Sequence, residues 1–256
     1  MPYIHRFLCA VLLVVVPLLA RESDRDIPEE VTFISSDSLT IYGDLYVDGD
    51  DRTSPMVLLF HQAGSCARGE YATIIPRLRK AGYAVLAIDQ RSGGSRLGGT
   101  NRTVAANNSA EAGYCEAYAD LEAALTFVSA RGFRGPRFAW GSSYSAALVV
   151  RLGAEHGESL AGVLAFSPAS GDPMGECQPG PYIDRLAIPA LILRPAREME
   201  IDKVRDQLAR FAAAGHRTHV AADGVHGSSM LNPERAGNVD ETWSVVLAFL
   251  KEVSEE

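Results

Sequence analysis

Short, nearly uninterrupted runs of apolar residues recur along this chain of 256 residues, and longer segments with a helical repeat separate them. The runs are too short for helices and lack polar alternation, which is typical of strands buried on both faces of a parallel sheet. In the segments between them, apolar residues return every three or four positions, as on one face of a helix. We expect strands over 56–60, 83–88, 137–140, 163–166, 190–193 and 219–222. We expect helices over 71–78, 114–128, 146–152, 204–214 and 243–250.

This alternation predicts a three-layer α/β fold with a mostly parallel central sheet and helices on both faces. Segments 31–35 and 39–47 are rich in β-branched and aromatic residues and flank the turn-forming sequence Ser-Asp-Ser, which predicts an N-terminal antiparallel hairpin. Because no repeat or linker divides the chain, we expect residues 21–256 to form one domain. Ligands bind such sheets at the carboxyl ends of the strands, so functional residues are expected directly after strands.

The first 20 residues are expected to be an export signal. His5 and Arg6 precede an apolar run over 7–20, and a charged stretch begins at Arg21. A run of this length suits the apolar part of a secretory signal peptide and is short for a membrane-spanning helix. An uncleaved membrane anchor and a buried N-terminal strand or helix are the alternatives. Cleavage after Ala20 predicts a periplasmic or extracellular protein without a stable membrane partner.

Charge and cysteine spacing exclude several classes of function. The 24 basic and 32 acidic residues give a net charge of −8, which disfavours a nucleic-acid partner. None of the four cysteines forms a CxxC pair, so the sequence offers no zinc or redox site. We therefore expect neither a metal nor an organic cofactor.

Residues 141–145, Gly-Ser-Ser-Tyr-Ser, lie between a predicted strand and a predicted helix. A sharp strand-to-helix turn raises one side chain above the sheet edge and needs small residues two positions before and after it. Ser143 meets this requirement through Gly141 and Ser145, whereas Ser142 and Ser145 fit the turn less well. Ser143 is therefore the candidate nucleophile, and an ordinary helix cap with spare hydroxyls is the alternative.

A serine needs an imidazole to take its proton near neutral pH. Of the six histidines, only His226 lies on a glycine-flanked loop after the last predicted strand, so it is the candidate base. His61 follows the first core strand, where we expect it to brace its loop with hydrogen bonds. Small residues in that loop can offer a backbone N–H which, with the N–H of Tyr144, would hold a developing oxyanion.

The candidate acid must lie between Ser143 and His226 in the inferred strand order. Strand 190–193 leads into a loop in which Glu198 is the first acidic residue. We favour Glu198 as the acid, while Glu200 and Asp202 remain alternatives. Each could instead be a solvated charge, and Asp202 could cap the helix that follows.

At residues 31–253 the chain resembles the α/β-hydrolase superfamily, in its dienelactone-hydrolase-like and serine-esterase-like branch. The motifs are the loop His61–Gly64, the Asp-Gln-Arg-Ser-Gly-Gly turn at 89–94, the Ser143 turn and the loop at 226–227. The resemblance implies a Ser143–Glu198–His226 triad and backbone oxyanion donors at Ala63 and Tyr144, with Gln62 as the alternative to Ala63. It also implies hydrolysis of small to medium carboxylic esters through an acyl-serine.

Three residues depart from the pattern of these families. Ser145 replaces the second glycine of the nucleophile turn, Gln62 replaces the glycine after the loop histidine, and Glu198 stands where aspartate is common. None of the three changes removes a group that the reaction needs. A peptidase of the same fold, or a non-catalytic protein that binds a ligand in the same cleft, are the alternative functions.

The walls of the expected cleft have the composition of loops. Residues 167–189 are rich in proline and glycine, which predicts a minimal cap and an open site. Residues 91–113 are rich in glycine, asparagine and serine and carry Arg91, Arg96 and Arg102. We expect these arginines to be solvated, with contact to an anionic substrate as the alternative.

After removal of the signal, three cysteines remain: Cys66, Cys115 and Cys177. Cys115 and Cys177 both fall at the carboxyl edge of the predicted sheet, so we expect them to form a disulfide in an exported protein. Cys66 lies at the same edge and competes for either partner. Three separate buried thiols are the alternative.

Overall fold

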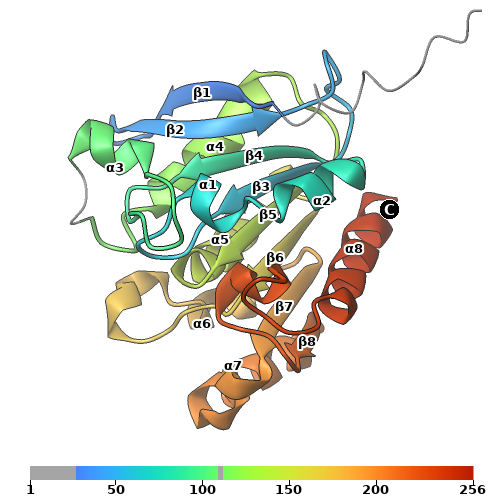
Figure 1. The fold of residues 1–256 in the computed structure, drawn as a ribbon. Helices are drawn as coiled ribbons and strands as arrows, with labels where there is room; N and C mark the ends of the chain where they lie inside the picture. Colours follow the sequence, from blue (N-terminus) through green and yellow to red (C-terminus); the bar gives the residue numbers. More distant parts are fainter. Residues whose placement is uncertain (1–26, 109–111, 256) are drawn as a thin grey trace, which may run out of the picture.

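A single sheet of eight strands, in the order β1-β2-β4-β3-β5-β6-β7-β8, organises the computed structural model, which describes residues 27–108 and 112–255 (Figure 1). β2 runs antiparallel to both of its neighbours, and all other neighbouring strands are parallel. The predicted mostly parallel sheet with an N-terminal antiparallel hairpin is confirmed. The strands are β1 Glu29–Ile34, β2 Thr40–Tyr46, β3 Met56–Phe60, β4 Ala84–Asp89, β5 Arg137–Ser142, β6 Gly162–Phe166, β7 Ala190–Pro195 and β8 Arg217–Ala221.

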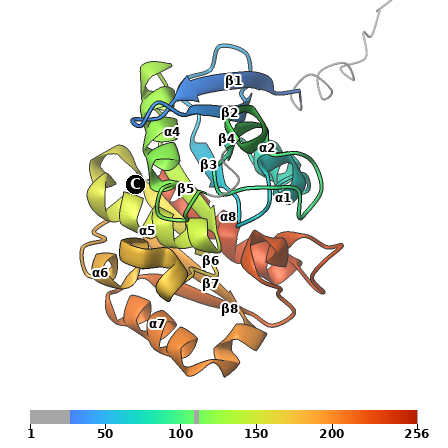
Figure 2. The ribbon, with the colours of Figure 1, turned by 90° about the vertical axis from the view of Figure 1, so that its left-hand side faces the viewer.

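Helices cover both faces of the sheet, which gives the predicted three layers (Figure 2). One face is covered by α4 (Tyr118–Ala130), α5 (Tyr144–Glu155), α6 (Gly180–Ile183) and α7 (Asp202–Ala213). The opposite face is covered by α1 (Ala67–Glu70), α2 (Ile75–Lys80) and α8 (Asp240–Ser254). The short helix α3 (Arg102–Asn107) packs beside β2.

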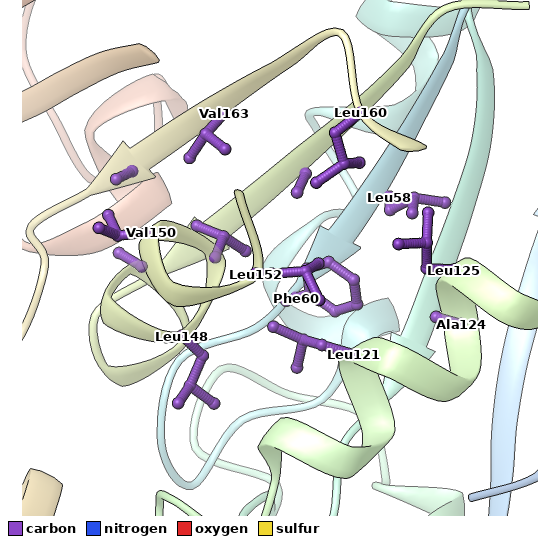
Figure 3. Packing of buried hydrophobic residues seen from close by; sticks show 14 of the residues in the cluster. Leu58, Phe60, Leu121, Ala124, Leu125, Leu148, Val150, Leu152, Leu160 and Val163 are labelled. Atoms are coloured by element: carbon purple, nitrogen blue, oxygen red, sulfur yellow. The ribbon is translucent and has the colours of Figure 1, made fainter. Parts of the chain in front are cut away.

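The central strands are unbroken apolar runs because both of their faces are covered. All five residues of β3 are buried, and successive side chains enter opposite layers. Phe60 lies near Leu121 of α4 and Leu152 of α5, and Leu58 lies near Leu125 of α4 in the same cluster (Figure 3). Leu59 packs on the side of α8. Burial of these side chains holds the strand ends, and thus the loops that follow them, in fixed positions.

Two predicted helices have different bounds in the structure. The helix expected over 71–78 begins only at Ile75, as α2, and extends to Lys80; residues 71–74 form a turn that follows α1, and Pro76 lies in the first turn of α2. Proline lacks an N–H and is favoured at a helix start, so the chain begins a new helix there. The helix expected from residue 114 starts at Tyr118, because Tyr114 and Cys115 belong to a turn before it.

None of the helices within 27–108 and 112–255 is long and apolar enough to span a membrane. The predicted export signal, residues 1–20, lies outside the described residues.

The predicted disulfide joins Cys115 and Cys177, whose Cα atoms lie 5.4 Å apart. It connects the turn before α4 to the segment between β6 and β7, so two loops at the carboxyl edge of the sheet are held together. Cys66 is a free, buried thiol that caps α1: its Sγ accepts a hydrogen bond from Gly69 N.

Replacing Cys115 and Cys177 by serine is expected to lower the free energy of unfolding by roughly 4 kcal/mol. The disulfide closes a separation of 62 residues and thereby reduces the entropy of the unfolded chain. Urea unfolding of the wild-type protein, with and without dithiothreitol, and of the double variant measures the difference. Reduction should lower the wild-type midpoint and leave the double variant unchanged. Equal midpoints of wild type and variant in non-reducing buffer would contradict the prediction.

Candidate active site

The three candidate triad side chains come from three loops at the carboxyl edge of the sheet. Ser143 lies between β5 and α5, Glu198 in the 3-10 turn after β7, and His226 in the loop after β8. His226 Nε2 is 2.9 Å from Ser143 Oγ, and His226 Nδ1 is 2.5 Å from Glu198 Oε1. The structure therefore brings the three side chains into one hydrogen-bonded chain, with the spacing that proton transfer from a serine requires.

Ser143 has the raised backbone conformation that the sequence predicts for a nucleophile turn. Its φ of 60° and ψ of −114° lie where residues other than glycine are strained. The N–H of Ser143 donates to Phe166 O at 2.8 Å, which ties the turn to β6. A side chain at Gly141 would place its Cβ only 2.2 Å from Ser145 O, so this position requires glycine.

Ser145, which replaces the second glycine of the turn, connects α5 to the loop His61–Gly64, the candidate oxyanion loop. Its hydroxyl donates to His61 O at 2.6 Å and accepts from Gln90 Nε2 at 3.0 Å. The hydroxyl is buried and both of its contacts are to buried groups. Ser145 thus supplies a link across the site that glycine would lack.

The loop that carries His226 is fastened to the strands beneath it. Gly227 N donates to Ser167 Oγ at 3.1 Å, and Ser228 N donates to Ser142 Oγ at 2.9 Å. Trp140 Nε1 in turn donates to Ser228 Oγ at 2.9 Å. These bonds hold the loop in the position from which His226 reaches Ser143.

Two backbone N–H groups, those of Ala63 and Tyr144, lack an acceptor within residues 27–108 and 112–255. Among the described residues, no acceptor pairs with the N–H of Ala63 or of Tyr144. Tyr144 is the first residue of α5, where an unpaired N–H and the helix dipole favour negative charge. The alternative donor, Gln62 N–H, is already bound to Glu70 Oε2 at 2.6 Å. Of the three candidate oxyanion donors, Ala63 and Tyr144 therefore have an unpaired N–H in the described structure, and Gln62 does not.

His61 is fully buried and braces the oxyanion loop, as its position in the sequence predicts. Its Nδ1 donates to Gln62 O at 2.8 Å, while its Nε2 accepts from Gln90 N at 2.9 Å. Asn101 Nδ2 also approaches Nε2, at 3.2 Å. Burial lowers the pKa of His61, because a proton on Nε2 would be charged, desolvated and opposed by these donors.

The lowered pKa of His61 predicts a loss of stability in acid. The unfolded chain takes up a proton below about pH 6.5, whereas folded His61 resists it, so the free energy of unfolding falls as the pH drops through this range. In His61→Gln this contribution is absent. Urea titrations from about pH 7.5 to about pH 5 should therefore show a shrinking stability difference between wild type and variant. A difference that stays constant with pH would contradict this assignment.

Glu198 is held on both sides of its carboxylate. Oε1 contacts His226, and Oε2 accepts from Arg194 Nη1 at 2.7 Å. Burial opposes ionisation, but the hydrogen bonds from His226 and Arg194 outweigh it and keep the pKa of Glu198 below its ordinary value. Arg194 also donates to the backbone carbonyl of Pro168 at 2.5 Å. It was missed in the sequence, although an arginine inside a buried strand is an unusual feature that could have indicated it.

The two alternative acids are not part of this hydrogen-bonded chain. Asp202 forms an ion pair with Arg205 and is exposed. It is the first residue of α7 and does not cap it, since Ile201 precedes the helix without a side-chain hydrogen bond. Glu200 is exposed on the same 3-10 turn as Glu198. Of the three carboxylates, only Glu198 contacts His226.

Two of the three loop arginines have structural contacts. Arg91 Nη2 donates to buried Asp120 at 2.7 Å, and Arg102 Nε donates to buried Asp89 at 2.7 Å. The prediction that these arginines are solvated is therefore wrong for Arg91 and Arg102. Their carboxylate partners lie on a different helix and a buried strand, and their proximity depends on the tertiary fold. Arg96 alone is exposed.

A cavity of about 380 Å³ opens beside the Glu198–His226 pair. Most of its accessible wall is apolar, and Ile201 stands 55% exposed within it. The lining residues are Pro195, Arg197, Glu198, Glu200, Ile201, Gly224, Val225 and His226. Within 27–108 and 112–255, no three His, Cys, Asp or Glu side chains are grouped to hold a metal ion.

Solved structures of esterases share this architecture. An esterase of Pyrococcus furiosus aligns with a TM-score of 0.67 and 19% identity, over 91% of this chain and 93% of its own. A thermostable carboxyl esterase of Bacillus coagulans aligns with a TM-score of 0.67 and 13% identity, over 89% and 99%. A Klebsiella pneumoniae protein described as a dienelactone hydrolase aligns with a TM-score of 0.66 and 17% identity, over 88% and 98%. At these low sequence identities, the structural similarity shows a shared fold.

Sequence comparison adds the family. No curated protein sequence matches this chain. The model of the Hydrolase_4 family, described as serine aminopeptidase, S33, matches residues 51–208, which is more than half of the chain. The matched range includes the oxyanion loop, Ser143 and Glu198. The chain is thus an α/β-hydrolase that belongs to the serine aminopeptidase S33 family.

Proposed function

We propose that this hydrolase is a serine esterase that cleaves small to medium carboxylic esters through an acyl-enzyme on Ser143. The observation that carries the proposal is the hydrogen-bonded chain from Glu198 through His226 to Ser143, at a strained turn, together with two unpaired N–H groups. A nucleophile, an oriented base and oxyanion donors are the groups that acyl transfer requires. No metal or organic cofactor enters the proposed reaction.

In the proposed reaction, Ser143 Oγ attacks the ester carbonyl while His226 Nε2 takes the serine proton. Glu198 keeps the imidazole oriented and stabilises its cation, and the N–H groups of Ala63 and Tyr144 hold the oxyanion. His226 then donates the proton to the departing alcohol, which leaves an acyl-serine. A water molecule deprotonated by His226 attacks this acyl group, and the acid is released as Ser143 regains its proton.

The cavity beside His226 supports a substrate with a short or medium apolar group. Ile201 and Val225 offer an apolar wall to such a group. The cavity volume of about 380 Å³ is at the lower end of the range for small-molecule sites. The connection between β6 and β7 contains only a 3-10 turn and the four-residue helix α6, which supports the minimal cap expected from the sequence. We therefore propose soluble esters as substrates in preference to long-chain lipids.

Kinetics on p-nitrophenyl acetate, butyrate, octanoate and palmitate tests the proposal. We expect kcat/KM to peak at a short or medium ester and to fall steeply at palmitate. The family description favours an aminopeptidase as the second candidate, so aminoacyl p-nitroanilides form the second arm. Faster cleavage of the anilides than of every ester would replace esterase by peptidase. Failure of a fluorophosphonate to label Ser143 would favour a non-catalytic ligand-binding protein.

We also propose that the protein acts outside the cytosol, in the periplasm or the extracellular space. A disulfide between Cys115 and Cys177 persists in oxidising compartments, and the apolar run over 7–20 is suited to export. Fractionation of cells that express the full chain, followed by N-terminal sequencing, tests this. A cytosolic protein that retains Met1 would overturn it, and a membrane fraction that retains it would indicate the uncleaved anchor.

A further inference from the structure

A buried carboxyl group with no assigned role lies behind the oxyanion loop. Glu70, the last residue of α1, is 3% exposed, and its Oε2 accepts the Gln62 N–H at 2.6 Å. Its Oε1 is buried without a hydrogen-bond partner, and no described lysine, arginine or histidine forms an ion pair with it. Burial of a carboxyl group in this way opposes folding. Its presence here therefore points to a role other than stability.

The surroundings of Glu70 connect it to all three parts of the site. Gln62 belongs to the oxyanion loop, and Ser142 directly precedes the nucleophile. The side chains of Ser142 and Gln62 favour the ionised form of Glu70, and so does the charge of a protonated His226. Burial, together with the charge of Glu70, raises the pKa of the phenols of Tyr71 and Tyr144 above its ordinary value. Burial is the larger influence and raises the pKa of Glu70 to about 7.

We propose that Glu70 is a positioning residue for the oxyanion hole. Its carboxylate holds the N–H of Gln62 pointing toward Glu70. The peptide planes that carry the Gln62 N–H and the Ala63 N–H meet at the Cα of Gln62, so this also restricts the direction of the Ala63 N–H. Without Glu70, the Gln62 N–H would be a buried donor with no acceptor, and the loop would turn to satisfy it. The inference rests on the proposed esterase reaction, since it assigns Ala63 to the oxyanion.

Two substitutions separate the hydrogen bond of Glu70 from its charge. Glu70→Gln keeps a carbonyl oxygen for the Gln62 N–H, whereas Glu70→Ala removes the acceptor. We expect Glu70→Ala to lower kcat about 10²-fold with little change in KM, comparable to the loss of one oxyanion donor. Glu70→Gln should restore most of this loss. Rates are expressed per active site titrated with a fluorophosphonate, so that unfolded protein does not count.

Arg79→Met is the matched control. Arg79 of α2 is also buried, and its Nη1 donates to Tyr83 O at 2.8 Å, just before the first residue of β4 and therefore at the opposite end of that strand from the oxyanion loop. This variant should lose stability and keep its kcat per active site. If Glu70→Ala behaves in the same way, with lower stability and unchanged kcat per site, Glu70 is merely structural and the proposal is overturned.

Hydrogen–deuterium exchange gives a readout that does not depend on ester hydrolysis. We expect faster exchange of the backbone amides of residues 61–66 in Glu70→Ala than in wild type, Glu70→Gln or Arg79→Met. Unchanged exchange in Glu70→Ala would overturn the positioning role even if the protein proved inactive on every ester. If exchange is faster in Glu70→Ala but the wild-type protein hydrolyses no ester, the two proposals separate. The role of Glu70 in fixing this loop would then be supported, and the esterase assignment would be overturned.

Discussion

Ser143→Ala is expected to abolish ester hydrolysis, with a fall in kcat of about 10⁴-fold or more, and to leave the fold intact. The substitution removes only the hydroxyl group, whose Oγ lies 2.9 Å from His226 Nε2. Loss of a triad nucleophile commonly lowers kcat by this factor. Steady-state kinetics on p-nitrophenyl butyrate and a circular dichroism spectrum measure the two outcomes.

The matched control for this experiment is Ser244→Ala. Ser244 is exposed on α8, and its hydroxyl bonds only its own helix, to Asp240 O at 2.8 Å. It should retain full activity and full fluorophosphonate labelling, whereas Ser143→Ala should lose both. An alanine variant of Ser143 with wild-type turnover would remove Ser143 from the reaction.

The second large effect is expected at the candidate acid. Glu198→Gln should lower kcat about 10³- to 10⁴-fold, because an amide can present its NH₂ group to His226 Nδ1 and favour the wrong tautomer. The amide also provides no charge to stabilise the imidazolium that forms during acyl transfer. Activity is measured per folded protein, since Arg194 Nη1 would lose its ion pair with Glu198 Oε2 and stability would fall as well.

Glu200→Gln is the matched control for Glu198→Gln. Both residues belong to the turn Ala196–Glu200, but Glu200 is exposed and only Glu198 contacts His226. The control should therefore change kcat little. If instead Glu200→Gln lost as much activity as Glu198→Gln, the role of the acid could not be assigned to Glu198.

Features that depend on neighbouring residues in the chain could be predicted from the sequence. β3, for example, is predicted with the same bounds because a five-residue apolar run has the length of a buried strand and is shorter than a helix. Ser143, Glu198 and His226 could be chosen because each directly follows a strand, and parallel strands bring such loops to one edge. The disulfide followed from the same argument, applied to Cys115 and Cys177.

Features that depend on distant partners could not be predicted. Arg91 looks like a solvated loop residue in the sequence, and only the fold brings it to Asp120 of α4. Glu70 directly precedes the helix predicted over 71–78, and nothing in the sequence indicates that it is buried beneath Gln62. The fold creates these contacts, and amino-acid periodicity contains no record of them.

The backbone conformation of Ser143 lowers the stability of the fold, whereas the proposed reaction needs a serine at this position. A residue other than glycine at φ 60°, ψ −114° costs about 1–3 kcal/mol, which is a substantial part of the 5–15 kcal/mol that holds a typical domain folded. Glycine would relieve this strain at an entropic cost of roughly 0.5–1 kcal/mol. Glycine at 143 would thus stabilise this chain but remove the proposed nucleophile. Selection for thermal stability alone should favour glycine at this position, and selection for turnover should maintain the serine.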